Sequence, residues 1–424
     1  MAWRDKRVLI TGLSGFVGAY LGEYLVKQGA NVFGLIRARA DGDIPRNIRN
    51  HHLDESVCLL TGDLLDPPSL VDALDQSQPD VIFHLAAQSF VPRSFQYPSE
   101  TYVANSMGTL NLFEAIRLRK LTPTFVFAGT HEEYGLVFSS QTQYEGFKSK
   151  YGFVFPEPVS IPELPIKETN PLRPTSPYGV AKVQGEYMTR NYALCWNIPA
   201  VVSRAFNHEG AGRGNMFVTS IIASQVARIA HGVGDRRIVI GNVNSFRDWS
   251  HVSDIVKGYC LLAESGVPGN IYNQGSQRTN SVLSYILLAI EEIGARVEKI
   301  ESFRNGKTVR EPVESDLNPQ WGHVFEKTRV DSLVLNGELS FDLADEGISV
   351  HTDTGPIPIY FDPQRFRPLE VPVLLSDTSK ARQLGFRVEH SVADIVHDQV
   401  KFYLDSGTEP GRPSVADEHP SSER

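Results

Sequence analysis

The stretch Arg7-Val-Leu-Ile-Thr-Gly-Leu-Ser-Gly-Phe-Val-Gly18 decides the fold of this chain. Its first four residues are typical of a buried β-strand, and a helical pattern over residues 19–28 follows its last glycine. Glycines between a strand and a helix permit a tight turn and let backbone N–H groups meet a pyrophosphate at the helix N-terminus. An ordinary glycine-rich turn is the structural alternative. We predict a phosphate-binding loop made of Gly12, Leu13, Ser14, Gly15, Phe16, Val17 and Gly18.

Short apolar runs continue beyond this loop, and stretches with helical periodicity separate them. The runs lie at residues 8–10, 32–36, 81–83 and 125–127. Such alternation predicts right-handed crossovers and a parallel sheet, and thus an α/β fold with a doubly wound Rossmann sheet. Later α/β elements at residues 200–205, 220–230 and 281–293 alternate with loop-rich segments. We expect those segments to form a smaller α/β substrate-binding lobe at the carboxyl edge of the sheet.

The chain divides into three parts on this pattern. We expect residues 1–200 to form mainly the dinucleotide-binding domain, residues 201–405 mainly the substrate-binding lobe with some Rossmann elements, and the polar residues 406–424 a disordered tail. Residues 136–166 and 302–355 have the character of insertions, and both are candidates to cover the active site. Within the second, the pair Asn336-Gly337 predicts a β-hairpin with a type I′ turn.

Composition narrows the class of protein. The 424 residues are 41% hydrophobic, which suits a buried core, and the net charge of -9 argues against nucleic acid or an anionic membrane as the main partner. No apolar run approaches the ~18 residues that span a bilayer, so we expect a cytoplasmic protein. Cys58, Cys195 and Cys260 are scattered without disulfide or metal-ligand spacing, and we expect no metal site.

The end of the second strand bears on the choice of cofactor. A carboxylate normally binds the ribose 2′-hydroxyl of NAD there, whereas Arg37 and Arg39 supply two guanidinium groups that suit the 2′-phosphate of NADP. Arginines on a solvated loop are the alternative. After the next strand, Asp63 is a candidate acceptor for the adenine amino group, with an acidic helix cap as its structural alternative.

A second motif supplies a proton-transfer pair. Pro177-Tyr178-Gly-Val-Ala-Lys182 opens a helix, and the i, i+4 spacing puts the Tyr178 hydroxyl and the Lys182 ammonium on one face. A nearby cation favours the phenolate, so we expect Tyr178 to act as a base near neutral pH and Lys182 to reach the nicotinamide ribose as well. Such a helix alone is common and mostly structural. The presence of this helix together with the glycine loop in one chain is a specific signal.

A third cluster follows the strand at residues 125–130. There Thr130, His131, Glu132 and Glu133 enter the ligand crevice of an open α/β sheet. We expect Thr130 to orient a substrate hydroxyl toward Tyr178 and Glu132 to abstract a carbon-bound proton beside a transient ketone. For Glu133 we favour a helix cap or a solvated position, which is also the alternative for Glu132.

Together these motifs resemble the extended short-chain dehydrogenases that modify nucleotide sugars, along with His84-Leu-Ala-Ala-Gln-Ser89. Within that family the chain is most similar to the GDP-mannose 4,6-dehydratases. The likeness covers nearly all of residues 6–405 apart from the two insertions, and four segments carry it: Arg204-Ala-Phe-Asn-His-Glu209, Gly212-Arg-Gly-Asn-Met-Phe-Val-Thr219, Arg247-Asp-Trp-Ser-His-Val-Ser-Asp254 and Arg367-Pro-Leu-Glu370.

The resemblance implies an NADP-dependent lyase that converts an NDP-hexose into an NDP-4-keto-6-deoxyhexose, in a homodimer or homotetramer. It implies that Thr130, Glu132, Tyr178 and Lys182 are catalytic. It adds cofactor contacts at Leu64, Leu85, Ala86, Ala87, Gln88, Ser89, Lys182, His208 and Arg213, and substrate contacts at Asn207, Arg247, Arg367 and Glu370. Ordinary surface pairing is the alternative for the arginines, and a buried core histidine is the alternative for His208.

This sequence departs from the dehydratase pattern in places. His131 stands where Ser, Thr or Asp is typical, Ser220 stands where Arg is usual, and Glu133-Tyr134-Gly135 also resembles the related ketosugar reductases. The first insertion lies between Thr130 and Tyr178, which are 48 positions apart. A ketosugar reductase or an epimerase is the nearest alternative function, and a non-catalytic NADP- or nucleotide-sugar-binding protein is the alternative of another class.

Overall fold

The computed structural model describes residues 3–38, 42–366 and 371–405. A seven-stranded sheet with strand order β11-β6-β5-β4-β1-β2-β3 lies at its centre, and every neighbouring pair in it is parallel. The predicted doubly wound parallel sheet is therefore confirmed. Its strands are β1 (Arg7–Thr11), β2 (Asn31–Ile36), β3 (Cys58–Thr61), β4 (Val81–His84), β5 (Thr124–Thr130), β6 (Ala200–Ala205) and β11 (Ile271–Gln274).

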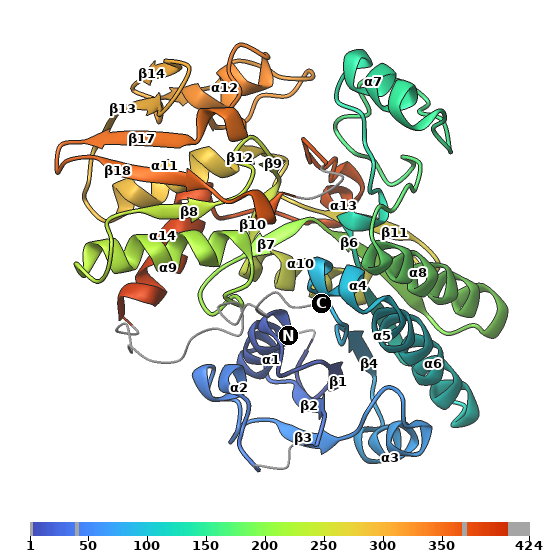
Figure 1. Ribbon diagram of the computed structural model, residues 1–424. Coiled ribbons are helices and arrows are strands. Elements are labelled where there is room, and N and C mark those ends of the chain that lie inside the picture. The colour runs from blue at the N-terminus through green and yellow to red at the C-terminus, as the bar shows by residue number, and fades with distance from the viewer. Residues whose placement is uncertain (1–2, 39–41, 367–370, 406–424) are drawn as a thin grey trace, which may run out of the picture.

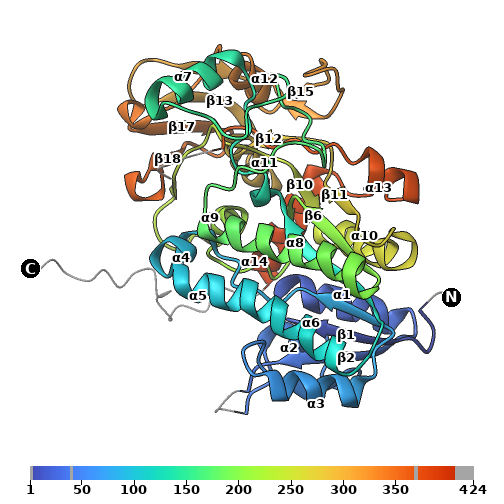
Figure 2. The same cartoon turned by 90° about the vertical axis from the view of Figure 1, so that its right-hand side faces the viewer.

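Helices cover both faces of this sheet because successive residues of its buried strands point to opposite sides. Leu9 of β1 packs with one layer of helices, while Val8 and Ile10 pack with the other. The first layer holds α3 (Pro67–Ser77), α6 (Gly108–Leu118) and α8 (Pro177–Trp196); the second holds α1 (Phe16–Lys27), α10 (Val252–Ser265) and α13 (Ser379–Leu384). Two short helices, α4 (Val91–Gln96) and α5 (Pro98–Tyr102), precede a π-helical turn (Val103–Met107) that runs into α6. Figure 2 shows α5, α6 and α8 side by side on one face of the molecule.

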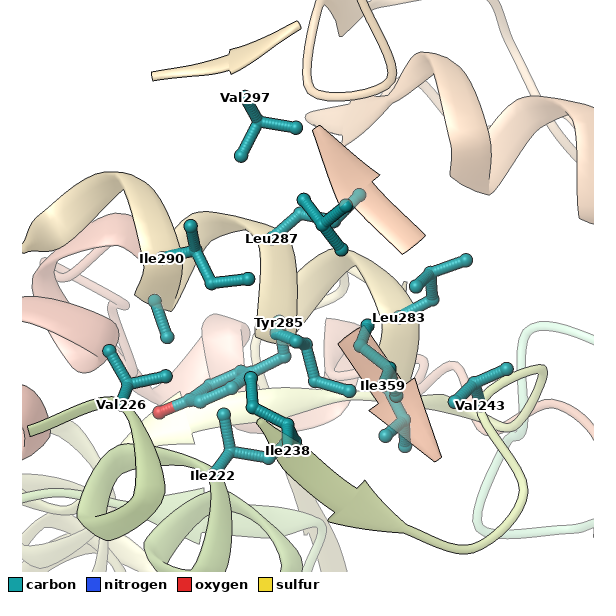
Figure 3. Packing of buried hydrophobic residues seen from close by; sticks show 14 of the residues in the cluster. Ile222, Val226, Ile238, Val243, Leu283, Tyr285, Leu287, Ile290, Val297 and Ile359 are labelled. Carbon is teal, nitrogen blue, oxygen red and sulfur yellow. The ribbon is translucent and has the colours of Figure 1, made fainter. Parts of the chain in front are cut away.

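A smaller lobe lies beyond the carboxyl edge of the sheet (Figure 1). Its five-stranded sheet has the order β14-β13-β17-β18-β8. Tyr285, Leu287 and Ile290 of its central helix pack against Ile222 and Ile359 in a closed apolar core (Figure 3). The expected second α/β lobe is present. Its elements are β8 (Ile238–Ile240), β13 (Val297–Ser302), β14 (Thr308–Arg310), β17 (Gly347–Thr352), β18 (Ile357–Phe361), α9 (Val218–Ala230), α11 (Val282–Glu292) and α14 (Val392–Asp405).

Three two-stranded ladders complete the structure. They pair β7 (Asn207–Glu209) with β10 (Trp249–His251), β9 (Phe246–Arg247) with β12 (Asn280–Ser281), and β15 (Ser315–Asp316) with β16 (Lys327–Thr328). Strand β7 of the first ladder follows β6 directly in the chain, so residues 207–209 lie next to the end of the main sheet. None of the helices in the described ranges combines the length and apolar character that crossing a bilayer requires.

The predicted hairpin at Asn336-Gly337 is wrong, because this pair ends helix α12 (Arg329–Leu335) instead. Asn336 is the C-cap, and Gly337 has φ 74° while its N–H bonds to the Val334 carbonyl oxygen at 3.1 Å. Residues with left-handed backbone angles occur both in type I′ turns and directly after many helices. The Asn-Gly pair alone therefore does not distinguish a hairpin from the end of a helix. The helix prevails because Thr328 and Asp331 form a capping box at its start.

The segment at residues 136–166 carries helix α7 (Gln141–Tyr151), which stands apart from the main sheet at the upper right of Figure 1. No residue of α7 is buried. A small aromatic cluster around Phe138 fixes its base, through Tyr144 and Phe147. The other suspected insertion, residues 302–355, contributes β17, an internal strand of the second sheet. This segment is therefore part of the lobe's framework.

Candidate active site

One large cleft opens at the carboxyl ends of β1, β2, β4, β5 and β6, with a volume of about 1430 Å³. This exceeds the 300–1,000 Å³ of usual small-molecule sites and suits two ligands side by side. Residues 136–166 and 302–355 do not contribute to its lining, and the expectation that they cover it stays a prediction. The predicted residues that line it are Gly12, Ser14, Gly15, Phe16, Val17, Gly18, Arg37, Asp63, Leu64, Leu85, Ala86, Ala87, Gln88, Ser89, Thr130, Glu132, Tyr178, Lys182, Asn207, His208 and Arg213.

The glycine loop has the geometry that a phosphate loop needs. Gly12 has φ 77°, and a Cβ there would lie 2.9 Å from the Ala86 backbone. At Gly18 a Cβ would lie 2.2 Å from the Gly12 carbonyl oxygen. Helix α1 begins directly after Gly15, whose position provides no side-chain cap, and its first turn has no acidic residue. The loop therefore presents backbone N–H groups and a positive helix end to the cleft.

Leu13 is the exception within this loop. Its side chain is fully buried, and a Cβ on Gly34 would lie 2.1 Å from it. Leu13 does not line the cleft, so its predicted cofactor contact is not supported. The position is apolar because it packs the loop against the core between β2 and helix α1.

A basic group faces the part of the cleft beyond β2. Arg37 lines the cleft as predicted, and Arg39 lies outside the described residues. Sequence reasoning missed Arg46 and Asn47, which open helix α2 (Arg46–Asn50) and also line the cleft. Asn47 Nδ2 donates to the Ser14 carbonyl oxygen at 3.1 Å and so ties α2 to the glycine loop. No motif spacing in the sequence links residues 46 and 47 to this loop.

Asp63 lies at the turn after β3. Its carboxylate accepts a hydrogen bond from the Leu65 N–H at 2.9 Å, which closes a local turn, while Asp66 is the N-cap residue of α3. Asp63 thus stabilises its own turn at the wall of the cleft, and its contact with adenine stays a prediction. Across the cleft, Gln88 N–H donates to Asn105 Oδ1 at 2.7 Å, which fixes the backbone of residues 85–89.

Tyr178 and Lys182 come into the cleft from the first turns of α8. Ser176 caps this helix by accepting from the Gly179 N–H at 3.0 Å. Lys182 is 4% exposed, and burial lowers the pKa of its ammonium to about 8. Its Nζ donates to the Ala128 carbonyl oxygen at 2.7 Å.

The charge environment of Tyr178 differs from the expectation. Burial, followed by the carboxylates of Glu132 and Glu133, raises the pKa of Tyr178, and a hydrogen bond with the Thr130 hydroxyl lowers it only in part. Within the chain itself, these causes oppose the phenolate that we expected near neutral pH. The Lys182 ammonium points to the Ala128 carbonyl oxygen, while two carboxylates face the phenol.

Thr130 begins a short 3-10 turn (His131–Glu133) that carries the third cluster. Thr130 Oγ1 accepts from the Glu132 N–H at 3.3 Å, and Glu133 accepts from the Thr130 N–H at 2.8 Å. The capping role expected of Glu133 is confirmed. Glu132 lines the cleft, and its Oε1 lies 3.9 Å from His131 Nε2. His131 stacks on Phe206 with ring centroids 5.6 Å apart, and it also lines the cleft.

The stretch after β6 closes the other side of the cleft. His208 Nδ1 lies 2.8 Å from the Phe206 carbonyl oxygen, and burial, then the Arg213 charge, lowers the pKa of His208 to about 3. The guanidinium carbon of Arg213 lies 3.7 Å from the Phe217 ring centroid, and Arg213 Nε lies 3.4 Å from Glu209 Oε2. A neutral imidazole and a guanidinium therefore face the cleft beside Asn207.

The four predicted substrate residues have different outcomes. Asn207 lines the cleft, whereas Arg247 does not, because its Nη1 donates to the carbonyl oxygens of Phe246 and Val371 at 2.8 and 2.9 Å. Arg367 and Glu370 lie outside the described residues. Arg247 therefore supports the backbone next to the segment that carries them, and its contact with a nucleotide stays a prediction.

Sequence reasoning also missed Arg93 and Glu100, which form an ion pair of 3.0 Å at the mouth of the cleft. On a sequence they have the pattern of any exposed pair on a short helix, and nothing marks them as site residues. In the described part of the chain, no group of three or more His, Cys, Asp or Glu side chains is placed to hold a metal ion.

The chain is similar to proteins of known name over nearly its whole length. It is 31% identical over 403 residues to a GDP-mannose 4,6-dehydratase of Yersinia enterocolitica, with 93% of each chain covered. It is 33% identical over 403 residues to a GDP-mannose 4,6-dehydratase of Vibrio cholerae (93% of this chain, 92% of the relative), and 30% identical over 407 residues to one of Drosophila melanogaster (94% and 86%).

Solved structures share the architecture. RMD from Pseudomonas aeruginosa, complexed with NADPH, gives a TM-score of 0.64 at 22% identity, covering 95% of this chain and 98% of that one. The UDP-glucose 4-epimerase of Thermotoga maritima, with UDP-glucose, gives 0.64 at 21%, covering 94% and 99%. At this identity the likeness concerns the fold. The model of the NAD dependent epimerase/dehydratase family matches residues 8–275, and the chain belongs to this family.

Proposed function

We propose that the protein is a GDP-mannose 4,6-dehydratase that uses tightly held NADP. One observation carries the proposal: Thr130, Glu132, Tyr178 and Lys182 line the same cleft as the glycine loop. Relatives that bear this name align with about 93% of the chain. A pure binding protein needs the loop but has no need of the four catalytic groups, so this arrangement favours an enzyme.

The residues divide the reaction between them. Tyr178 accepts the C4 hydroxyl proton of the hexose while Thr130 orients that hydroxyl, and C4 becomes a ketone. The ketone acidifies the C5 hydrogen, which Glu132 removes. Water leaves from C6, with Glu132 or His131 as the proton donor. NADP, when bound, supplies the hydride acceptor at C4 and returns the hydride at C6.

The residues of the cleft fit this cofactor. The N–H groups of the glycine loop would hold the pyrophosphate, and Lys182 would hold the nicotinamide ribose. The cofactor's positive ring would act against the burial and the negative charge that raise the pKa of Tyr178, which favours the phenolate. Arg37 and Arg46 support NADP over NAD because both guanidinium groups line the cleft beyond β2.

We also propose a homodimer or a homotetramer. The continuous helix α5–α6 and helix α8 lie side by side on one face and expose Val103, Met107, Tyr187 and Leu194. A pair of such helices covers its apolar side chains by packing on the same pair of a second copy. Light scattering at micromolar concentration tests this, and a monomer contradicts it. The free thiols Cys58, Cys195 and Cys260 suit the reducing cytoplasm, where we place the protein.

A panel of GDP-, UDP-, CDP- and dTDP-hexoses tests the proposed function. Each is incubated with the enzyme, and the mass of the product is measured. We expect GDP-mannose to lose one water without net consumption of NADPH. A ketosugar reductase would consume NADPH, an epimerase would leave the mass unchanged, and a non-catalytic binder would leave every substrate unchanged.

A further inference from the structure

Two buried carboxyl groups and one buried guanidinium lie beneath the turn that carries Thr130. Glu133 and Glu186 have 0% exposed side chains, and the side chain of Arg204 is 2% exposed. Arg204 Nε and Nη2 each donate to Glu186 at 2.7 Å in a bidentate pair. The Glu133 carboxyl lies farther away, with Oε2 3.4 Å from Arg204 Nε. The guanidinium is thus committed to Glu186.

If both carboxyl groups are ionised, Arg204 has to compensate two buried negative charges, because the nearby Lys182 ammonium donates to the Ala128 carbonyl oxygen instead. Arg190 approaches Glu186 only to 3.8 Å and is 37% exposed, so it neutralises little of the buried charge. The other ionisable groups that face Glu133 are Tyr178 and Lys182 of α8, and Glu132 and Tyr134 of its own turn. An uncompensated buried carboxylate costs several kcal/mol, and in proteins such a group binds a proton instead.

Glu133 also holds the catalytic turn in place. It accepts from the Thr130 N–H at 2.8 Å, and a Cβ on Gly129 would lie 2.6 Å from Glu133 Oε1. The carboxyl group therefore lies directly on the end of β5, where only glycine leaves room. Since Thr130 Oγ1 accepts from the Glu132 N–H, Glu133 helps to hold the Thr130 side chain and the backbone of Glu132 in place.

We propose that Glu133 is a positioning residue held as a neutral carboxylic acid beside the Arg204–Glu186 pair, which anchors the Thr130 turn without adding a negative charge beside Tyr178. Burial, then the Glu186 charge, raises the pKa of Glu133 well above its ordinary range, while Arg204 acts in the opposite direction. The charge of an ionised Glu133 is one of the causes that raise the pKa of Tyr178, and the neutral acid removes that cause. Its neutral form therefore keeps the proton acceptor usable. The effect on catalysis rests on the proposed function.

Difference infrared spectroscopy at neutral pH tests the proton directly. A protonated carboxyl has a C=O stretch distinct from that of a carboxylate, and we expect Glu133→Gln to remove one such band. Glu186→Gln should remove it too, because Glu133 would then face Arg204 alone and ionise. Glu163→Gln is the matched control: Glu163 is 2% exposed, accepts from the Phe138 N–H and pairs one to one with Arg173. This control should leave the band unchanged.

Kinetics test the positioning role. Glu133→Gln keeps the acceptor for Thr130 and should retain most of the wild-type kcat, whereas Glu133→Leu should lower kcat by roughly 10²-fold with little change in KM. A band that survives in Glu133→Gln overturns the neutral Glu133 carboxylic acid, and equal losses of kcat in the two variants overturn the positioning role. The infrared result does not depend on the reaction. If the dehydratase assignment is wrong, the product mass will show it, and the infrared result will not change.

Discussion

Lys182 donates a hydrogen bond of 2.7 Å to the carbonyl oxygen of Ala128, two residues before Thr130. This bond joins the helix that carries Tyr178 to the strand that carries the Thr130 turn. The two halves of the catalytic set, separated by 48 positions in the sequence, are thereby fixed to each other. Lys182 is a structural link between them as well as a charged group of the cleft.

The buried ammonium of Lys182 gives a pH-dependent stability. Burial lowers the pKa of Lys182 in the folded protein from 10.5 to about 8, so the folded protein favours the neutral amine. The contribution of Lys182 to the free energy of unfolding is therefore largest above pH 10.5 and is lost as the pH falls from 10.5 through about 8. We expect the wild type to gain on the order of 3 kcal/mol over Lys182→Met between these limits. Urea unfolding of both proteins without cofactor measures the difference. Parallel stability curves would contradict a buried, titrating Lys182.

Tyr178→Phe keeps the buried ring but removes the group that accepts the C4 hydroxyl proton. We expect the first hydride transfer to slow by roughly 10²–10⁴-fold, with no NADPH absorbance in a single turnover. The control is Tyr144→Phe: Tyr144 lies on the exposed helix α7 and donates its hydroxyl to Glu157, so this variant should react like the wild type. Normal NADPH formation in Tyr178→Phe would remove Tyr178 from the proton-transfer role.

Glu132→Gln should separate the first oxidation from the elimination. The amide keeps the size of the side chain but lacks the basic oxygen that removes the C5 proton. Single-turnover experiments should therefore show NADPH formation without loss of water, and the recovered sugar should contain no solvent deuterium at C5. Turnover at the wild-type rate would show that another group is the C5 base.

The cofactor preference depends on the guanidinium groups at the end of the cleft beyond β2. We expect NADP to bind more tightly than NAD, and Arg37→Ala to weaken NADP by about tenfold while leaving NAD nearly unchanged. Arg49→Ala on the same helix as Arg46 is the control, because Arg49 does not line the cleft. Calorimetric titration with both cofactors measures the effect. A preference for NAD that survives Arg37→Ala would contradict the assignment.

Local patterns predicted the parts of the site that local geometry determines. The glycine loop and the Tyr178–Lys182 helix each depend on a few neighbouring residues, so their sequence pattern was sufficient. The raised pKa of Tyr178 was not predictable, because it depends on burial and on carboxylates from another element. The Glu133–Arg204–Glu186 cluster likewise forms only when β5, β6 and α8 pack together. The inward position of the Leu13 side chain was not predictable either, because a loop motif does not show which of its residues points inward.

The product of GDP-mannose in deuterated water tests the central claim most directly. Mass spectrometry and proton NMR of a complete reaction report loss of water, the group at C6 and the isotope at C5 together. We predict a product with one water lost, a ketone at C4, a methyl group at C6 and deuterium at C5, formed without net consumption of NADPH. A product that keeps the C6 hydroxyl, with or without oxidation of NADPH, would contradict the dehydratase assignment.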